Sequence, residues 1–326
     1  MLSRACLFFL FILHLVALKA QEVNFRHLTV EDGLSQNTIN CIYQDHYGFM
    51  WFGTQDGLNC YDGLNFTTYR SVPEDSGTLS HNWIWDITED ASHNLWIATW
   101  NGLTKYDRSL RSFQRFLPDS ADQRSISGTR PASLVRASNG KIWVGIWGGG
   151  LNLLDPVKGE FTRYRDAEEP GRNYPGDYVR KLHMDREGMI WVGTWNGLWR
   201  CRMGADSALH FDSFLPDPDD PNSLSSMRIT SFCEDRDGHL WIGTLGGGLN
   251  LFDRDRNQFT RFRHDPEDAT SLSSNDVTSI ELLADGSLWV GTVNSGLNRM
   301  VRGGRAFSRF NYDPSDPGSI STDNVY

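Results

Sequence analysis

Hydrophobic and polar residues alternate in short segments along this chain, and the segments recur in one order about every 45 to 50 residues. In the fifth copy, residues 228–233 alternate and predict a strand, and residues 235–238 predict a tight turn. Residues 240–244, 249–252 and 259–262 predict three further strands. Each copy therefore predicts a sheet of four short antiparallel strands.

A tryptophan marks the second predicted strand of every copy. Repetition at this period is typical of propellers, solenoids and arrays, and four strands a copy favour the β-propeller, whose unit is called a blade. We expect the tryptophan to fill the space between neighbouring blades, and the small residue two positions later to leave room for a bulky neighbour. These structural tryptophans are Trp51, Trp96, Trp143, Trp191, Trp241 and Trp289.

The number of copies predicts an all-β, seven-bladed propeller of four-stranded blades. Six copies are complete, the last ending at Phe310, and residues 319–326 repeat residues 271–278 as the start of a blade seven that stops within its first strand. Residues 25–28 resemble the last strand of each copy, so we expect this N-terminal strand to close the ring. Because natural domains avoid open sheet edges, we expect the chain to be the N-terminal fragment of a longer protein.

The first 20 residues predict a secretory signal peptide. Arg4 precedes an apolar run that ends at Leu18, and Ala20 suits the position before a cleavage site. An uncleaved membrane anchor is the alternative, although the run is short for a span of about 20 residues. We therefore expect a signal peptide at 1–20 and a propeller at 21–326, in an exported protein.

Composition narrows the function classes. The formal net charge is −10 and no basic stripe is visible, so we expect this segment to contact no nucleic acid. Export permits disulfides, but the four cysteines after the signal occupy strand-like positions without paired spacing, which favours buried free thiols. They are Cys41, Cys60, Cys201 and Cys233.

A candidate binding face comes from the loops between second and third strands, where the copies differ. Blades two, three and four place Trp100, Trp147 and Trp195 at one loop position, and Asn101 and Asn196 follow two of them.

The loop leading into blade two adds His81 and Trp83 to the same face. The hypothesis is an aromatic cluster that stacks on a sugar or a peptide, with asparagines as hydrogen-bonding groups. The alternative is that these tryptophans only plug the mouth of the channel by packing on one another.

The sequence gives little support for catalysis or metal binding. Asp45, Asp90, Asp185 and Asp235 stand at one turn position in several copies, which favours a structural role. The acidic loops between blades lack the ligand spacing and glycine of an EF-hand. We expect no catalytic residues, no metal and no cofactor in this segment, and a propeller lyase or glycosidase is the less favoured alternative.

The opening of the predicted propeller resembles the two-component regulator propellers. The matching motifs are Glu31-Asp32-Gly33-Leu34-Ser35-Gln36-Asn37, residues 45–54, Asp56-Gly57-Leu58 and Tyr61-Asp62-Gly63, and the resemblance continues through all six copies. It implies the exported sensor region of a hybrid histidine kinase. Such proteins usually carry a second propeller, a β-sandwich, a membrane helix and a cytoplasmic kinase, and many respond to oligosaccharides.

The resemblance therefore implies extracytoplasmic ligand sensing in a two-component system, with an oligosaccharide as the leading ligand. A protein-interaction scaffold and the sensor region of a diguanylate cyclase are alternatives. The implied partners are the ligand and the missing C-terminal domains, which would tether the chain to the inner membrane from the periplasm; a homodimer is left open. No kinase motif is present in this segment, although the full-length protein would be a sensor histidine kinase.

Overall fold

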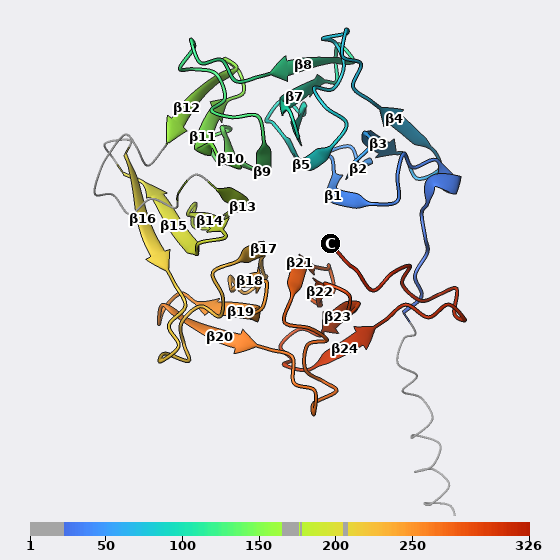
Figure 1. The fold of residues 1–326 in the computed structure, drawn as a ribbon, viewed down its shortest axis with the longest axis vertical. Helices are drawn as coiled ribbons and strands as arrows, with labels where there is room; N and C mark the ends of the chain where they lie inside the picture. Colours follow the sequence, from blue (N-terminus) through green and yellow to red (C-terminus); the bar gives the residue numbers. More distant parts are fainter. Residues whose placement is uncertain (1–22, 165–175, 177, 205–207) are drawn as a thin grey trace, which may run out of the picture.

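The computed structural model describes residues 23–164, 176, 178–204 and 208–326 (Figure 1). In these residues, strands form six antiparallel sheets of four strands each, arranged around a central axis as the blades of an all-β propeller. The predicted signal peptide, 1–20, lies outside the described residues.

The strands follow one another along the chain, and a short 3-10 helix, η1 (Val30–Asp32), precedes them. Blade one contains β1 (Ile39–Gln44), β2 (Met50–Thr54), β3 (Leu58–Tyr61) and β4 (Phe66–Tyr69). Blade two contains β5 (Ile84–Glu89), β6 (Leu95–Thr99), β7 (Gly102–Asp107) and β8 (Ser112–Phe116). Blade three contains β9 (Pro131–Arg136), β10 (Ile142–Ile146), β11 (Gly150–Asp155) and β12 (Glu160–Tyr164). Blade four contains β13 (Val179–Met184), β14 (Ile190–Thr194), β15 (Leu198–Met203) and β16 (Leu209–Phe214). Blade five contains β17 (Ile229–Glu234), β18 (Leu240–Thr244), β19 (Gly248–Asp253) and β20 (Gln258–Phe262). Blade six contains β21 (Val277–Leu282), β22 (Leu288–Thr292), β23 (Leu297–Met300) and β24 (Phe307–Phe310).

In every blade, the first strand lies nearest the axis and the fourth lies at the rim (Figure 1). The second strands are buried on both faces, because neighbouring blades cover them; all five residues of β14 and of β18 are buried. A Cβ atom on Gly193 would lie 2.6 Å from the side chain of Ile229 in the next blade, so this position has room only for hydrogen.

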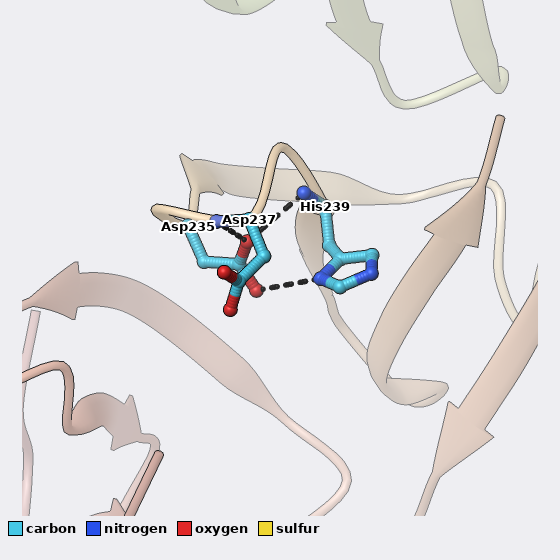
Figure 2. A group of neighbouring side chains, drawn as sticks. All are labelled: Asp235, Asp237 and His239. Atoms are coloured by element: carbon cyan, nitrogen blue, oxygen red, sulfur yellow. Dashed lines mark hydrogen bonds and ion pairs between the residues drawn. The ribbon is translucent and has the colours of Figure 1, made fainter. Parts of the chain in front are cut away.

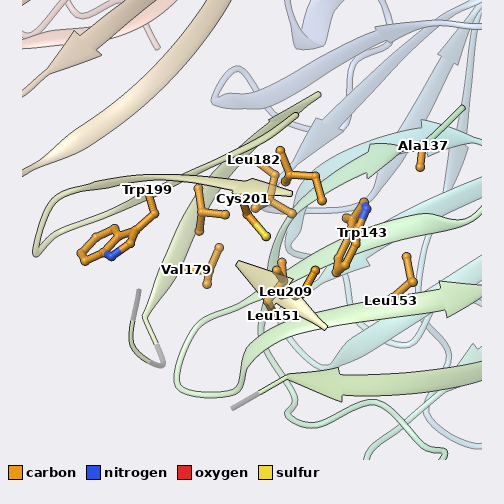
Figure 3. Packing of buried hydrophobic residues seen from close by; sticks show 11 residues of the cluster. Ala137, Trp143, Leu151, Leu153, Val179, Leu182, Trp199, Cys201 and Leu209 are labelled. Atoms are coloured by element: carbon orange, nitrogen blue, oxygen red, sulfur yellow. The ribbon is translucent and has the colours of Figure 1, made fainter. Parts of the chain in front are cut away.

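Apolar side chains fill the spaces between blades. Between blades three and four, Trp143 and Leu151 face Val179, Leu182 and Cys201 in one buried cluster (Figure 3). Five of the six repeat tryptophans are buried, and Trp289 is half-buried. The apolar side chains between the blades therefore form the main hydrophobic core of the propeller.

The prediction of a seven-bladed ring is wrong, because the described residues form six four-stranded blades. Neither residues 25–28 nor residues 319–326 form a strand. Phe25 makes one backbone hydrogen bond, to the carbonyl oxygen of Gly318, and its ring packs on Trp289 and Phe310. A strand needs a ladder of such bonds, which these segments lack.

The two terminal segments instead lie against blade six. Val325 donates its N–H to the carbonyl oxygen of Thr292 and approaches Gly291, as Val277 approaches Gly243 one blade earlier. First strands pack side by side from β1 through to β21. Within the described residues, no comparable packing joins β21 to β1.

Two further findings concern the cysteines and possible membrane-spanning helices. The four described cysteines are free, and burial raises the pKa of the Cys201 thiol to about 12. Among the described residues, no helix has the length and apolar character needed to cross a membrane.

Candidate functional site

The loops from second to third strands, and those that lead into each next blade, form one face of the propeller, which we call the loop face. On it, the side chains of Trp83, Trp85 and Trp100 form a first aromatic cluster, with ring centroids 5.3 to 5.8 Å apart. The Trp100 N–H donates to the carbonyl oxygen of Trp83, which joins the two loops. The guanidinium of Arg130 lies 4.5 Å from the Trp100 ring, within the range of a cation–π contact.

A second aromatic cluster contains Trp147, Tyr178 and Trp195. The Trp147 ring meets the Trp195 ring edge to face at 5.0 Å and the Tyr178 ring at 5.4 Å. Trp195 and Tyr178 keep 44% and 52% of their surface exposed, which is high for such large side chains. This cluster therefore offers aromatic surface to a partner.

Each cluster carries an arginine. The Arg180 guanidinium lies 5.7 Å from the Trp195 ring, and burial lowers its pKa. Arg130 lies between the clusters, because its carbonyl oxygen accepts the Trp147 N–H while its guanidinium covers Trp100. Within the described residues, neither arginine side chain makes a hydrogen bond or an ion pair, and the Nε atom of Arg180 is buried without a partner.

The predicted site residues therefore divide into two groups. Trp100 and Trp83 meet in the first cluster, Trp147 and Trp195 meet in the second, and no ring contact joins the two within the described residues.

The three polar residues of the predicted site, His81, Asn101 and Asn196, have different surroundings. The His81 Nδ1 atom accepts the Trp83 N–H, so this ring holds the loop, and burial lowers its pKa. Asn101 and Asn196 are exposed, and each donates its backbone N–H to the threonine two residues earlier. Their amide groups make no hydrogen bond within the described residues.

Sequence reasoning missed Trp85, Tyr178, Arg130 and Arg180. Trp85 follows Trp83 by two residues, and this period places both side chains on one side of an extended segment. The two arginines and Tyr178 stand at the starts of β9 and β13, where no repeat motif singles them out.

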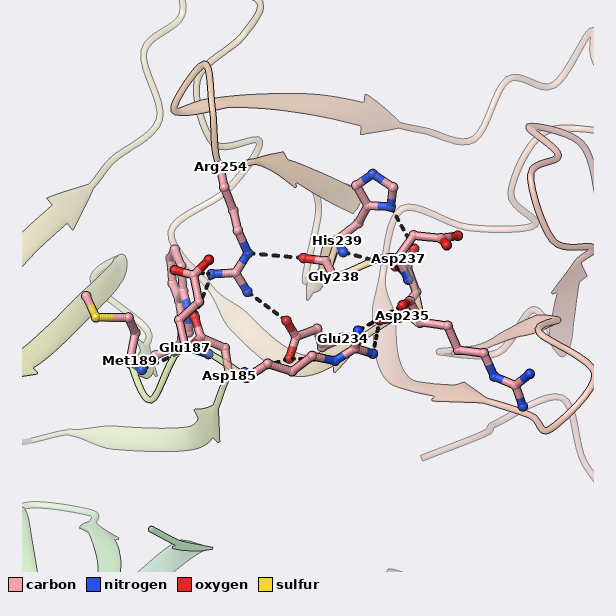
Figure 4. A network of polar contacts seen from close by, with 12 residues as sticks. Asp185, Glu187, Met189, Glu234, Asp235, Asp237, Gly238, His239 and Arg254 are labelled. Atoms are coloured by element: carbon pink, nitrogen blue, oxygen red, sulfur yellow. Dashed lines mark hydrogen bonds and ion pairs between the residues drawn. The ribbon is translucent and has the colours of Figure 1, made fainter. Parts of the chain in front are cut away.

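The opposite face carries the turns between first and second strands, which we call the turn face. Asp185 accepts the Trp191 indole N–H at 2.8 Å and an Arg254 N–H at 2.7 Å, and Arg254 also donates to Glu234 at 2.9 Å (Figure 4). Burial alone would raise the pKa of the Asp185 carboxyl, but these hydrogen bonds outweigh burial and lower it. Such a carboxylate has its counter-ion and its donors, which agrees with a structural role.

Asp235, Asp237 and His239 are the one group of potential metal ligands found in the described residues (Figure 2). Asp235 already accepts the N–H groups of Asp237 and His239, the Trp241 indole and the His239 ring at 2.9 to 3.1 Å. Arg302 pairs with Asp237 at 2.8 Å. A metal would have to displace these donors, so the group does not present a prepared metal site.

Comparisons with known proteins agree with this architecture. A family model described as "Two component regulator propeller" matches residues 33–56, 78–101, 173–196, 223–246 and 271–294. These matches cover the second strand of five blades and the loop that follows it.

One curated relative is "Histidine kinase P4" of Formosa agariphila, which is 49% identical over 67 residues, or 20% of this chain and 5% of the kinase. Among solved structures, an extracellular domain attributed to a hybrid two-component system of B. thetaiotaomicron has a TM-score of 0.77 and 25% identity, over 93% of this chain and 38% of that one. The chain therefore spans well under half the length of these relatives.

Virginiamycin B lyase from Staphylococcus aureus is also similar, with a TM-score of 0.60 and 15% identity over 89% of this chain and 87% of the lyase. At that identity the likeness concerns the fold alone.

Proposed function

Because the repeats of this chain belong to the two-component regulator propeller family, we propose that it is an extracytoplasmic ligand-sensing propeller of a hybrid histidine kinase. Its similarity to an extracellular domain of such a system, and its short match to a histidine kinase, support the proposal. The segment itself would bind rather than catalyse, since the carboxylates at the repeated turn position, such as Asp45 and Asp185, are occupied as structural acceptors.

The observation that carries the binding role is the pair of aromatic clusters on the loop face, the second of which exposes Trp195 and Tyr178. Aromatic rings with a few placed polar groups are the usual design of a ligand site. Trp100 and Trp195 would stack on the apolar faces of sugar rings, and Arg130, Asn101 and Asn196 would donate hydrogen bonds to hydroxyl groups. The proposed ligand is therefore an oligosaccharide long enough to reach both clusters.

Binding transmits a signal only if the ligand prefers one arrangement of the sensor over another. In the proposed protein, the ligand on the loop face favours one arrangement of the periplasmic assembly, and a membrane helix passes this shift to the kinase. In this proposal the segment is periplasmic, as part of a protein that is tethered to the inner membrane.

A protein-binding scaffold is the second candidate. Tryptophan, tyrosine and arginine are the residue types that dominate the energetics of protein interfaces. The exposure of Trp195 and Tyr178 fits a protein partner as well as a sugar.

The test replaces Trp100, Trp147 and Trp195 together by alanine and measures melting temperature with a panel of neutral and acidic oligosaccharides. We expect a sugar of the panel to raise the melting temperature of the unmodified protein, and the triple variant to lose that rise. Tyr312→Ala, which removes an aromatic ring that is 48% exposed elsewhere, is the control and should keep it.

An unchanged rise in the triple variant would show that the ligand binds elsewhere. If no sugar of the panel stabilises the unmodified protein, the oligosaccharide part of the proposal is wrong. Binding of a periplasmic protein that the triple variant loses would then favour the scaffold.

A further inference from the structure

A polar contact recurs where neighbouring blades meet on the turn face. In each case an arginine directly after the third strand of one blade contacts an aspartate of the preceding blade. That aspartate lies in the turn between the first and second strands. Arg108 meets Asp45 at 2.6 Å between blades one and two, and Arg254 meets Asp185 at 2.7 Å between blades four and five. Both arginine side chains are about four-fifths buried.

A glutamate at the end of the first strand completes each contact. Glu89 lies 3.8 Å from Arg108, and Glu234 lies 2.9 Å from Arg254 (Figure 4). We call this group of aspartate, arginine and glutamate the clamp. Two carboxylates draw each guanidinium into the space between the blades.

The boundary between blades five and six has the aspartate and the arginine of a clamp but not the glutamate. Leu282 stands at the end of β21, where Glu234 ends β17. Arg302 turns outward to Asp237, and 56% of its side chain is exposed. Asp235 keeps the Trp241 indole N–H and takes the His239 ring at 3.1 Å in place of the arginine.

A cavity of about 220 Å³ lies at this boundary, and we call it the five–six pocket. Apolar side chains form much of its wall, and Asp235 and His239 also line it. In the two complete clamps, a guanidinium occupies the corresponding place beside the turn aspartate. The apolar lining residues are Trp241, Leu251, Phe262, Leu282, Leu288, Met300 and Val301.

We propose that the five–six pocket binds a free basic amino acid, whose guanidinium or ammonium group replaces the His239 ring as a donor to Asp235. Asp235 supplies the charge, and the Trp241 indole supplies an aromatic face, as Trp51 does at 5.5 Å from the Arg108 guanidinium. The alkyl stem of the ligand lies on Leu282 and Met300.

Arginines also line the pocket, and they would bind the α-carboxylate of the ligand. Arg302 is paired with Asp237, and Arg236 donates to the carbonyl oxygen of Ala284. Arg305 lines the pocket and is exposed. A simple cation would be repelled by these arginines, whereas an α-carboxylate pairs with them. The pocket lies on the turn face, so this proposal does not depend on the oligosaccharide site of the loop face.

The test is isothermal titration calorimetry on the full chain with arginine as the probe. Agmatine lacks the carboxylate, and citrulline lacks the positive charge. We expect arginine to bind, agmatine to bind more weakly, and citrulline not to bind. Asp235→Asn keeps the size of the side chain and removes its charge, so it should weaken arginine binding by about tenfold or more.

Two variants separate the pocket from a general charge effect. Leu282→Glu restores the missing glutamate, so it should draw Arg302 inward, fill the pocket and abolish binding. Asp253→Asn removes a turn carboxylate of the same blade that pairs with Arg256, and it should leave binding unchanged. Because Leu282→Glu buries a charge and could impair folding, Asp235→Asn is the deciding variant.

The proposal is wrong if the unmodified chain shows no saturable heat with arginine. It is equally wrong if Asp235→Asn binds arginine as tightly as the unmodified chain does, or if citrulline binds as well as arginine.

Discussion

Trp191 and Trp195 stand four residues apart in blade four, and their surroundings differ completely. Trp191 has no exposed surface, packs on Phe214 and Phe252 with ring centroids 5.6 and 5.1 Å away, and donates its indole N–H to Asp185. Trp195 is 44% exposed and touches Trp147 across a blade boundary. Tryptophan thus packs between the blades at one position and presents a surface on the loop face at the other.

The difference follows from position in the repeat. Trp191 lies in a second strand, where neighbouring blades cover both faces, so every copy has a tryptophan there. Trp195 lies in the loop after that strand, where packing places no such demand and the copies differ. Difference among copies is therefore more informative about binding than the repeated phrase itself. The residues at this loop position are Gln55, Trp100, Trp147, Trp195, Leu245 and Val293.

The largest effect is expected when the packed member of the pair is removed. Trp191→Ala should lower the free energy of unfolding by about 4 kcal/mol, because it opens a cavity between blades and removes one of the hydrogen-bond donors to the buried Asp185. Urea unfolding followed by circular dichroism measures this. A loss below about 1 kcal/mol would mean that the blades repack without the indole.

A smaller effect is expected from the carboxylate that holds Trp191. Asp185→Asn should cost about 3 kcal/mol at neutral pH, because it leaves the buried Arg254 with one carboxylate fewer. The control is Asp212→Asn, which removes an exposed carboxylate of the same blade that pairs with Arg200. That change should cost less than about 1 kcal/mol.

The pH dependence sharpens this second prediction. The folded-state pKa of Asp185 lies below its usual value, so its contribution is complete above about pH 4 and is lost as the pH falls through the folded-state pKa. The unmodified chain should lose stability in this acid range, and Asp185→Asn should lose less. Parallel curves for the two proteins would contradict the assignment.

The smallest effect on stability is expected on the loop face. Trp195→Ala should change the free energy of unfolding by less than about 1 kcal/mol, because the side chain already contacts solvent. The same urea titration measures it. A loss as large as that of Trp191→Ala would mean that Trp195 is a packing residue, which favours the channel-plug alternative over a binding site.

Much of the blade could be predicted from local pattern. Alternation from residue 228 to residue 233 and the turn at Asp235 agree with β17 and the hairpin that follows it. The blade count was wrong because residues 319–326 repeat a strand sequence but have no ladder partner among the described residues. A strand pattern states a preference, and pairing with a neighbour decides whether the strand forms.

The candidate site could be predicted only in part. Trp100, Trp147 and Trp195 were accessible because they stand at one repeat position. Arg130 and Tyr178 were not, because their contacts join neighbouring blades through positions that share no motif.

The sequence by itself determined the repeat, the four strands of each blade and the tryptophan between blades, because these depend on interactions that each copy makes in the same way. The tertiary structure decided how residues 25–28 and 319–326 lie on blade six, which loop tryptophans meet, and where the five–six pocket opens. Those outcomes depend on residues about fifty positions apart that become neighbours only when blades pack. Leu282, which stands where the clamps have a glutamate, is inconspicuous along the chain. Its effect on the contact between blades five and six arises only in the assembled propeller.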